Sequence, residues 1–499
     1  MNSKFLGIDL GTTNSCMAIM LHGRAEVIPN AEGHRSTPSI VAFTESGVEL
    51  VGQAAQRQAV TNPQNTIHSV KRFLGRKYDE FKHELHFLPY KLVKAANGDA
   101  HIEVKGQVFS PMEISAKILK KLKLDAEAHI GEIISKVVIA VPAHFDYAQR
   151  QATKAAGRVA GFETTCIVSS PVAAAIAYGL DKKKDEKICV YDLGGGSFNV
   201  AVLELGDGVY EVKATSGDTY LGGDDLDGAI VHRLIVDFKS ETGIDLKQNA
   251  CALQRLKEAA EKAKCELSLA SSTEINLPFI AADSSGPKHL TQTLTRAKLD
   301  ELGGILIERT IFPVKQCLKD AGLSSDELDA VLMIGGMSRM PKAIEAAKSL
   351  TGNKPHGGVN PDEIVAIGAA IQGGIFKGEV TDVLFLDVLP ISIGVETQGG
   401  VFTKMIERNT TIPTNKTEVC SFPVNEQNEV VIDVFQGERA LTANNTNLGT
   451  LRLKRGMPSA FEGAPTSVKI EVTMDIDAHQ TIYVTAKDPR SGQEQRIII

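Results

Sequence analysis

The sequence predicts a two-lobed α/β domain followed by an all-β domain, and three observations support this fold class. Residues 1–180 alternate short β-branched runs with helical patterns, which is typical of α/β proteins. A strand that ends in an aspartate and a glycine turn occurs twice, and such an internal repeat indicates two similar lobes that face each other. From residue 391 onward, strand patterns dominate.

The composition describes a globular chain and argues against several classes of partner. With 499 residues, 43% of them apolar, the chain is long enough for about three domains of roughly 150 residues. A net charge of −7 gives no basic field, so we expect no nucleic-acid partner. No apolar run approaches the roughly 20 residues that span a bilayer, so we expect no membrane insertion. Seven cysteines without a C-x-x-C pair predict buried free thiols in a reducing compartment.

The first glycine turn follows the apolar strand that begins at Phe5. In F-L-G-I-D-L-G-T-T-N-S-C-M the strand carries one carboxylate, Asp9, and Gly11 removes a side chain where a backbone would approach a ligand closely. The amides and hydroxyls that follow suit phosphate oxygens, and Asp9 suits a metal held through water. These donors belong to Thr12, Thr13 and Asn14. For this motif alone, an ordinary hairpin with a glycine turn is the alternative.

A near copy of this motif lies at 188–202, I-C-V-Y-D-L-G-G-G-S-F-N-V-A-V. It again places a carboxylate, Asp192, before a glycine turn, and it adds the hydroxyl of Ser197. The turn consists of Gly194, Gly195 and Gly196. Two such units that face each other would leave a cleft between them, and a nucleotide fits such a cleft.

One helical pattern supplies polar groups for the rest of a nucleotide. The helix expected over 253–268 has a core stripe of leucine and alanine at helical spacing. Glu261, Lys264 and Ser268 follow one another on a different face, where three polar tips would grip an adenine and a ribose. The alternative for this row is an ordinary solvated face.

A third glycine turn lies at 331–341, V-L-M-I-G-G-M-S-R-M-P. Gly335 and Gly336 would allow a flat base to lie close, and Arg339 would stack on it. The G-x-x-x-x-G-K-[ST] phosphate loop is missing from the sequence, so the chain is not a P-loop NTPase.

The composition changes after Gly374, where the α/β pattern gives way to strands. The apolar run V-L-F-L within 379–390 predicts an interdomain linker that can dock, with an ordinary buried strand as the alternative. Beyond it, 467–477 alternates apolar and polar residues as a half-buried strand does. With 430–435 and 482–486, it predicts a β-sandwich of about 110 residues.

Together these motifs resemble the seventy-kilodalton heat-shock chaperone family. The resemblance rests on D-L-G-T-T-N-S, D-L-G-G-G, E-K-A-K-C-E-L-S, I-G-G-M-S-R-M-P, N-P-D-E and D-V-L-F-L-D-V, which cover the whole chain in order. Segments such as A-V-T-N-P-Q-N-T look most like the mitochondrial and DnaK-type bacterial branch. The resemblance implies an actin-like ATPase domain over 1–378, a linker over 379–390 and a peptide-binding β-sandwich over 391–499. It also implies a mitochondrial matrix, a related organelle or a bacterial cytoplasm as the location.

The resemblance assigns roles to residues that the motifs alone leave open. It implies ATP or ADP with Mg²⁺ and K⁺, where Asp9 and Asp192 organise the cations and Lys71, otherwise an ordinary surface lysine, stabilises the transferring phosphoryl. Ser197 joins them in catalysis. Further nucleotide contacts are implied for Gly222, Gly223, Ser338 and Asp362. The relay from nucleotide to linker is implied at Pro142, Arg150, Leu384 and Asp387. The peptide groove is implied at Val395, Gln398, Ser421, Pro423, Gln427, Val430 and Ile432.

Several residues depart from the family pattern. The family's Asn-Glu-Pro is Ser169-Ser170-Pro171 here, so the carboxylate that would order the water around the metal is gone. Asn199 replaces an expected Asp, and Ser197 replaces a Thr. The remaining departures are Cys166, where the branch often has a basic residue used by J-domain partners, and Gln398 and Pro423 at the arch of the peptide groove. We also expect no C-terminal helical lid.

The leading interpretation is an ATP-regulated chaperone that binds extended apolar peptides of unfolded clients, with a J-domain co-chaperone and a nucleotide exchange factor as partners. Its role would lie in protein folding, import or iron–sulfur cluster assembly. A sugar-type kinase of the same actin-like fold is one alternative. A nucleotide-stabilised scaffold that has lost hydrolysis is another, because Ser170 and Asn199 carry no negative charge.

Overall fold

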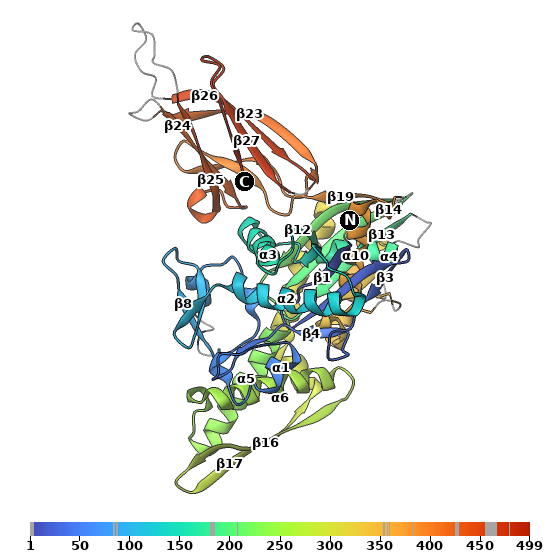
Figure 1. Cartoon of the computed structure of the whole chain (residues 1–499), viewed down its shortest axis with the longest axis vertical. Helices are drawn as coiled ribbons and strands as arrows, with labels where there is room; N and C mark the ends of the chain where they lie inside the picture. The colour runs from blue at the N-terminus through green and yellow to red at the C-terminus, as the bar shows by residue number, and fades with distance from the viewer. Residues whose placement is uncertain are drawn as a thin grey trace. The chain divides into compact units, whose positions relative to one another are not determined.

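The computed structural model describes residues 4–82, 85, 88–179, 185–206, 208–352, 355–356, 358, 360–381, 383–424, 429–454, 467–478 and 480–499. Contacts between Cα atoms divide the chain into two compact units, one of residues 1–207 and 216–383 and one of residues 208–215 and 384–499. Figure 1 shows the elements of both units. The domain limits at 378 and 390 stay a prediction.

The first sheet of the first unit has a parallel pair at its centre. β1 (Phe5–Asp9) pairs in parallel with β11 (Lys136–Val141) and antiparallel with β2 (Asn14–Leu21). The order β12-β11-β1-β2-β3 is completed by β12 (Thr164–Ser169), β3 (Arg24–Val27) and β4 (Ser36–Pro38), which pairs with β2. β11 is one of the β-branched runs that alternate with helical patterns within residues 1–180.

Small residues let helices lie directly on this sheet. α10 (Ile364–Lys377) contacts β1, β2 and α4 (Ser170–Gly179). A Cβ on Gly7 would meet the backbone N of Ala370 at 2.2 Å, and one on Gly368 would meet the carbonyl oxygen of Ala173 at 1.7 Å. Backbone therefore lies against backbone at both contacts. The other helices of this part are α1 (Gln53–Arg57), α2 (Pro111–Ile130) and α3 (Tyr147–Val159). α3 is one of the helical patterns that alternate with strands within residues 1–180.

The second sheet repeats the plan of the first. β13 (Glu186–Leu193) pairs in parallel with β18 (Ala330–Ile334) and antiparallel with β14 (Phe198–Gly206). Asp192 lies near the end of β13 as Asp9 lies at the end of β1. The predicted repeat of strand, aspartate and glycine turn is thus present as two equivalent arrangements of strands.

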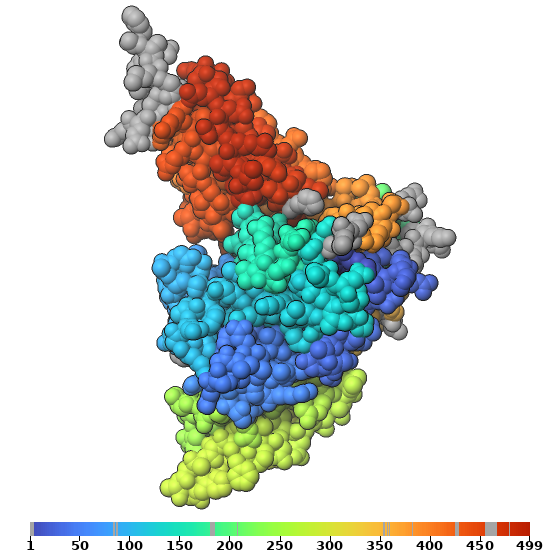
Figure 2. Space-filling model, viewed as in Figure 1, coloured from blue at the N-terminus to red at the C-terminus, as the bar shows by residue number. Residues whose placement is uncertain are grey.

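The elements between β14 and β18 carry the predicted polar helix. α6 (Ala250–Leu267) buries its leucine and alanine stripe as predicted. It packs on α5 (Gly223–Thr242) and on the hairpin of β16 (Ser272–Asp283) and β17 (Gly286–Thr295), which is yellow-green in Figure 2. The helices α7 (Arg296–Leu302), α8 (Gly304–Asp320) and α9 (Pro341–Thr351) follow along the chain.

Two small sheets complete the first unit. The first consists of β5 (Val41–Phe43), β6 (Glu49–Val51) and β7 (Thr66–Ile67), and the second of β8 (Lys91–Lys94), β9 (Ala100–Val104) and β10 (Gln107–Phe109). β7 leads into the short 3₁₀ helix Val70–Phe73, which becomes important for the site.

The predicted docking segment forms a strand that pairs on both edges in the second unit. β19 (Leu384–Val388) pairs in parallel with β15 (Val209–Asp218) and antiparallel with β22 (Thr411–Ile412). Burial increases along β19, from a 57% exposed Leu384 to a 2% exposed Val388. Asp387 accepts a hydrogen bond of 3.0 Å from the side-chain amide of Gln480. Asp382, the other acid that flanks the V-L-F-L run, lies outside the described residues.

The rest of the second unit consists of two four-stranded antiparallel sheets. One has the order β21 (Val401–Ile406), β20 (Ile393–Thr397), β24 (Glu429–Gln436) and β25 (Thr446–Lys454). The other has the order β23 (Thr414–Pro423), β26 (Ser467–Ile476), β27 (Ile482–Lys487) and β28 (Glu494–Ile498). Apolar residues alternate into the interior along β26, so the three predicted strands are confirmed.

The cysteines differ in part from the prediction. All seven are free, but Cys251 and Cys265 are exposed and Cys166 is half-buried. Both exposed thiols lie on α6, where the apolar stripe faces away from them. Among the described helices, none combines the length and apolar character needed to cross a membrane.

Candidate functional site

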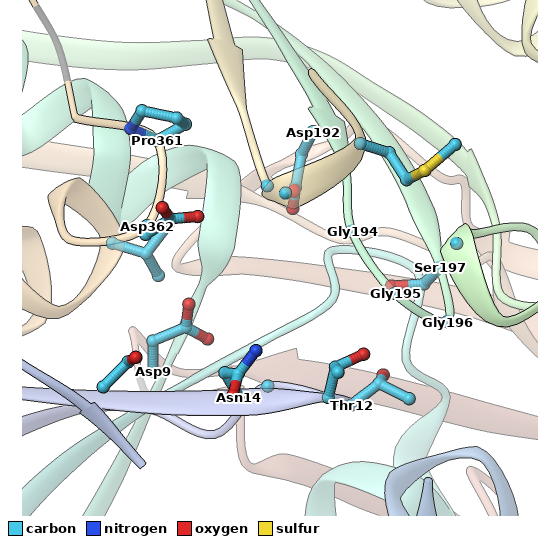
Figure 3. Close-up of a pocket in the computed structure, with 18 of the residues that line it drawn as sticks. Asp9, Thr12, Asn14, Asp192, Gly194, Gly195, Gly196, Ser197, Pro361 and Asp362 are labelled. Carbon is cyan, nitrogen blue, oxygen red and sulfur yellow. The ribbon is translucent and has the colours of Figure 1, made fainter. Parts of the chain in front are cut away.

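The three predicted glycine turns meet at one cavity of about 330 Å³ in the first unit. Figure 3 shows Asp9, Thr12 and Asn14 on one side and the turn of Gly194 to Gly196 on the other. The predicted residues that line the cavity are Asp9, Gly11, Thr12, Thr13, Asn14, Lys71, Pro142, Asp192, Gly194, Gly195, Gly196, Ser197, Gly223, Glu261, Lys264, Ser268, Gly335, Gly336, Arg339 and Asp362.

The first two turns touch each other, which explains why glycine is needed. A Cβ on Gly195 would lie 2.2 Å from the hydroxyl oxygen of Thr13, and one on Gly196 would lie 2.6 Å from that of Thr12. Because no side chain intervenes, the hydroxyls and amides of both turns converge on the same space. Such concave sets of donors are suited to phosphate groups.

The third turn is held in place by groups behind the cavity wall. Gly335 has a φ of 80°, and a Cβ there would lie 2.5 Å from the carbonyl oxygen of Leu193. Ser338 donates to the Gly335 carbonyl at 2.6 Å. A Cβ on Gly222 would likewise lie 2.5 Å from the carbonyl oxygen of Gly195. Nucleotide contacts are predicted from the sequence for Ser338 and Gly222. In the structure these residues brace the turns and are not among the residues that line the cavity.

A half-buried carboxylate, Asp9, lies in the site with a buried carboxylate, Asp192, and a buried ammonium group, Lys71. Burial raises the pKa of Asp9, and burial together with Asp9 raises the pKa of Asp192 to about 7. Burial lowers the pKa of Lys71, and the charges of Asp9 and Asp192 partly offset this decrease. When both carboxylates are ionised, they carry more negative charge than Lys71 alone neutralises. A cation between phosphates and carboxylates would relieve this imbalance.

The site suits a cation that is held mainly through water and phosphates. Within the described residues, no group of three or more His, Cys, Asp or Glu side chains forms a metal-binding cluster. Glu261 and Asp362 also line the cavity, but Asp9 and Asp192 are the carboxylates whose charges act on Lys71. Mg²⁺ is commonly bound by one or two carboxylates with water and substrate phosphates, so these residues fit Mg²⁺.

The polar row on α6 opens to the cavity as predicted. Lys264 is held by an ion pair of 2.7 Å with Asp227 and by the Gly223 carbonyl at 3.2 Å. On the opposite side, Arg339 forms a short ion pair with Asp362. Lys264 thus fixes the start of α5 beside the cavity, and the Arg339 side chain is held by an acid on the cavity wall.

Pro142 and Arg150 are physically linked, as the predicted relay requires. Arg150 is buried and donates to the carbonyls of Phe145 and Ala143, both at 2.9 Å. Its guanidinium therefore holds the loop that begins at Pro142, which lines the cavity. The relay function itself stays a prediction.

The two substituted positions differ in their relation to the cavity. Ser170 lines it, and its hydroxyl donates to the Val141 carbonyl at 3.0 Å. Asn199 lies behind the wall, is 1% exposed, and donates from its side-chain amide to Asp192 at 3.2 Å. Asn199 therefore acts on the site through Asp192.

Sequence reasoning missed several residues of the cavity wall. These are Ser15, Cys16, Ser36, Cys265, Met337, Met340, Pro361 and Val365. Ser39 was also missed, although its hydroxyl donates to the Gly11 carbonyl at 2.8 Å and braces the first turn. Proximity to the motifs would have suggested Ser15, Cys16, Cys265 and Pro361, whereas nothing in the local pattern marks Ser36 or Ser39.

The predicted peptide-groove residues separate into two sets. Val395, Val430 and Ile432 are fully buried at 0% exposure. The exposed residues are Gln398, Ser421 and Pro423, and Gln427 lies outside the described residues. The buried valines and isoleucine belong to the interior of the second unit, so their part in a groove stays a prediction.

The site is suited to phosphate groups together with a cation, because three glycine turns converge on it beside Asp9, Asp192 and the buried Lys71. A family model described as Hsp70 protein matches residues 5–499. The chain belongs to the Hsp70 family, as its motifs led us to expect. Members of this family are ATPases that bind ATP and ADP with Mg²⁺ and act as ATP-dependent chaperones.

Proposed function

We propose that this chain is an ATP-regulated chaperone that binds extended apolar segments of unfolded clients. The first unit would be an actin-like ATPase and the second a peptide-binding β-sandwich. The observation that carries the proposal is the single cavity formed by three glycine turns around Asp9, Asp192 and Lys71. A J-domain co-chaperone and a nucleotide exchange factor would act on the nucleotide cycle.

The residues of the cavity suggest a division of labour. The hydroxyls and amides of the first two turns would hold the phosphates, while Glu261, Lys264 and Ser268 would face the nucleoside. Asp9 and Asp192 would hold Mg²⁺ through water, and K⁺ would share the negative site. Mg²⁺ would neutralise charge on the phosphates. Lys71 would stabilise the charge that develops as the phosphoryl group transfers.

Two measurements test this function against the alternatives. ATP should be hydrolysed in a single turnover, and it should accelerate release of a fluorescent apolar peptide from the full chain. Transfer of the γ-phosphate to a sugar, with no effect on peptide, would instead establish a sugar-type kinase. Tight ATP binding without any turnover would establish the scaffold, which the uncharged Ser170 and Asn199 favour.

Coupling between nucleotide and peptide should depend on the buried part of β19. Leu386→Asp places a charge in a half-buried strand position, so ATP should lose most of its effect on the peptide release rate. Ile498→Asp is the matched control, because the Ile498 side chain on β28 is 69% exposed and has no part in the predicted relay. Stopped-flow peptide release with and without ATP measures both. Full coupling in Leu386→Asp would contradict the role of this strand.

Peptide exchange should respond to the exposed positions of the proposed groove. Gln398→Met with Pro423→Ala restores the apolar arch of the family pattern, and we expect peptide release to slow about two- to tenfold, because affinity changes mostly act on dissociation. These positions are exposed, so the change should not disturb the core. Val430→Phe is less suitable, since overpacking a fully buried site typically costs about 1–3 kcal/mol. An unchanged release rate would place the peptide elsewhere.

A further inference from the structure

A row of polar contacts joins the segment that carries Lys71 to the start of α5. Ser69 donates a short hydrogen bond from its hydroxyl to the carboxylate of Asp224. Arg72 forms an ion pair of 2.7 Å with Asp225. The partners are 155 and 153 positions apart in the sequence. These contacts lie outside the cavity wall, and the chemistry proposed above does not use them.

Lys71 lies between the two residues that make these contacts. Ser69 and Arg72 are buried, at 6% and 8% exposure, and reach α5, whereas Lys71 lines the cavity. The backbone of Ser69 has a φ of 56°, in the left-handed region that residues other than glycine rarely adopt. Such a conformation persists where the surrounding contacts hold it. Ser69 immediately precedes the 3₁₀ helix Val70–Phe73. Within this helix, Lys71 lines the cavity whereas Arg72 reaches α5.

The aspartate at the other end of each contact is fixed either to the second glycine turn or to Gly222, which lies against that turn. The backbone N–H of Asp224 donates to the Gly195 carbonyl at 2.8 Å. The second carboxylate oxygen of Asp225 accepts from the N–H of Gly222 at 2.8 Å. Gly195 itself touches Thr13 of the first turn. Asp224 therefore connects the Lys71 segment, through its carboxylate, to a turn that would hold phosphate, through its backbone N–H.

The charges around Asp224 favour a permanent contact. Burial alone would raise the pKa of Asp224, but Lys257, Arg72, the Ser69 hydrogen bond and Lys264 together lower it. The ammonium of Lys257 also lies 2.8 Å from Nδ1 of His68. Burial and Lys257 hold the pKa of His68 well below its ordinary value, so the imidazole is neutral and accepts from Lys257. Asp224 thus remains an ionised acceptor for Ser69.

We propose that Ser69 is a positioning residue, which holds Lys71 at a fixed place relative to the second glycine turn through its hydrogen bond to Asp224. The Arg72–Asp225 ion pair supplies a second point of attachment on the other side of Lys71. The inference rests on the proposed ATPase function. Small displacements of a catalytic group reduce the rate of reaction strongly while many distributed contacts keep the substrate bound.

Ser69→Ala and Ser69→Gly separate the hydroxyl from the backbone. Both remove the hydrogen bond to Asp224, but glycine adopts the φ of 56° freely. If the hydroxyl positions Lys71, both variants should lower kcat for ATP hydrolysis about tenfold and leave KM within about twofold. Full activity in Ser69→Gly would show that the backbone turn alone positions Lys71. Ser240→Ala, which removes an exposed hydroxyl, is the control and should hydrolyse ATP at the normal rate.

Hydrogen exchange tests the attachment independently of ATP hydrolysis. In the nucleotide-free protein, Ser69→Ala should increase exchange at the amides of 222–226 as well as at 69–74, because the two segments are held to each other. Unchanged protection at 222–226 would overturn the inference whether or not the protein hydrolyses ATP. Loss of protection there in a protein without ATPase activity would support the attachment and reject the proposed function.

Discussion

Replacing Lys71 with alanine should lower single-turnover ATP hydrolysis about 100- to 1,000-fold while the dissociation constant for ATP changes less than about tenfold. The ammonium is buried and interacts with the charges of Asp9 and Asp192, and in such a site a fixed charge acts strongly on charge that develops during transfer. The nucleotide itself would contact three turns and α6, so its affinity is distributed over many groups. Hydrolysis of γ-labelled ATP and titration with a fluorescent ATP analogue measure the two quantities.

Two further variants show whether the charge of Lys71 is responsible. Lys71→Met keeps most of the side-chain volume, so it should be as slow as Lys71→Ala if charge matters and nearly normal if packing matters. Lys262→Ala removes an exposed lysine of α6 and should leave the rate unchanged. Equal losses of affinity and rate in Lys71→Met would contradict the catalytic role.

The double change Ser170→Glu with Asn199→Asp should raise single-turnover hydrolysis about 10- to 100-fold and leave ATP affinity within a few-fold. Groups that act on a metal through water typically contribute about this much. Ser170→Glu should supply most of the gain, because Ser170 lines the cavity. Asn199→Asp alone should not help, since it places a second buried carboxylate beside Asp192 in place of an amide donor.

The neutral variant Ser170→Gln provides the control for the double change. It has the size of glutamate without its charge, so it should leave the rate low. A rate that rises equally with glutamine and glutamate would show that side-chain volume limits hydrolysis. A rate that rises with neither would show that the missing carboxylates are not the limiting feature of this protein.

The turns could be predicted from the sequence because their chemistry is local. Strand, aspartate and glycine follow one another along the chain, and helical spacing alone places Glu261 and Lys264 on one face. Lys71 could be assigned only through the family resemblance, because its segment has no periodic pattern. The contact between Ser69 and Asp224 could not be predicted at all, since it joins residues 155 positions apart. The wall residue Ser36 was missed for the same reason, since its place depends on how distant strands pair.

The second unit shows a different limit to what can be predicted from the sequence. Alternation along β26 predicts which side chains turn inward, and the structure confirms it. Alternation does not distinguish an interior between two sheets from a groove that a ligand enters, because both are apolar. Val430 illustrates this, since its pattern fits a peptide pocket and its side chain is 0% exposed.

The contacts of α10 limit which amino-acid substitutions this chain can accept during evolution. Gly7 lies against the backbone of Ala370, and Gly368 lies against the backbone of Ala173. A neighbouring side chain can change its rotamer to accept an added methyl group, but a helix or strand backbone cannot. At these two positions a single hydrogen atom is the largest substituent that leaves both backbones in place, so random substitution would retain only glycine there, however well the rest of the core adapts.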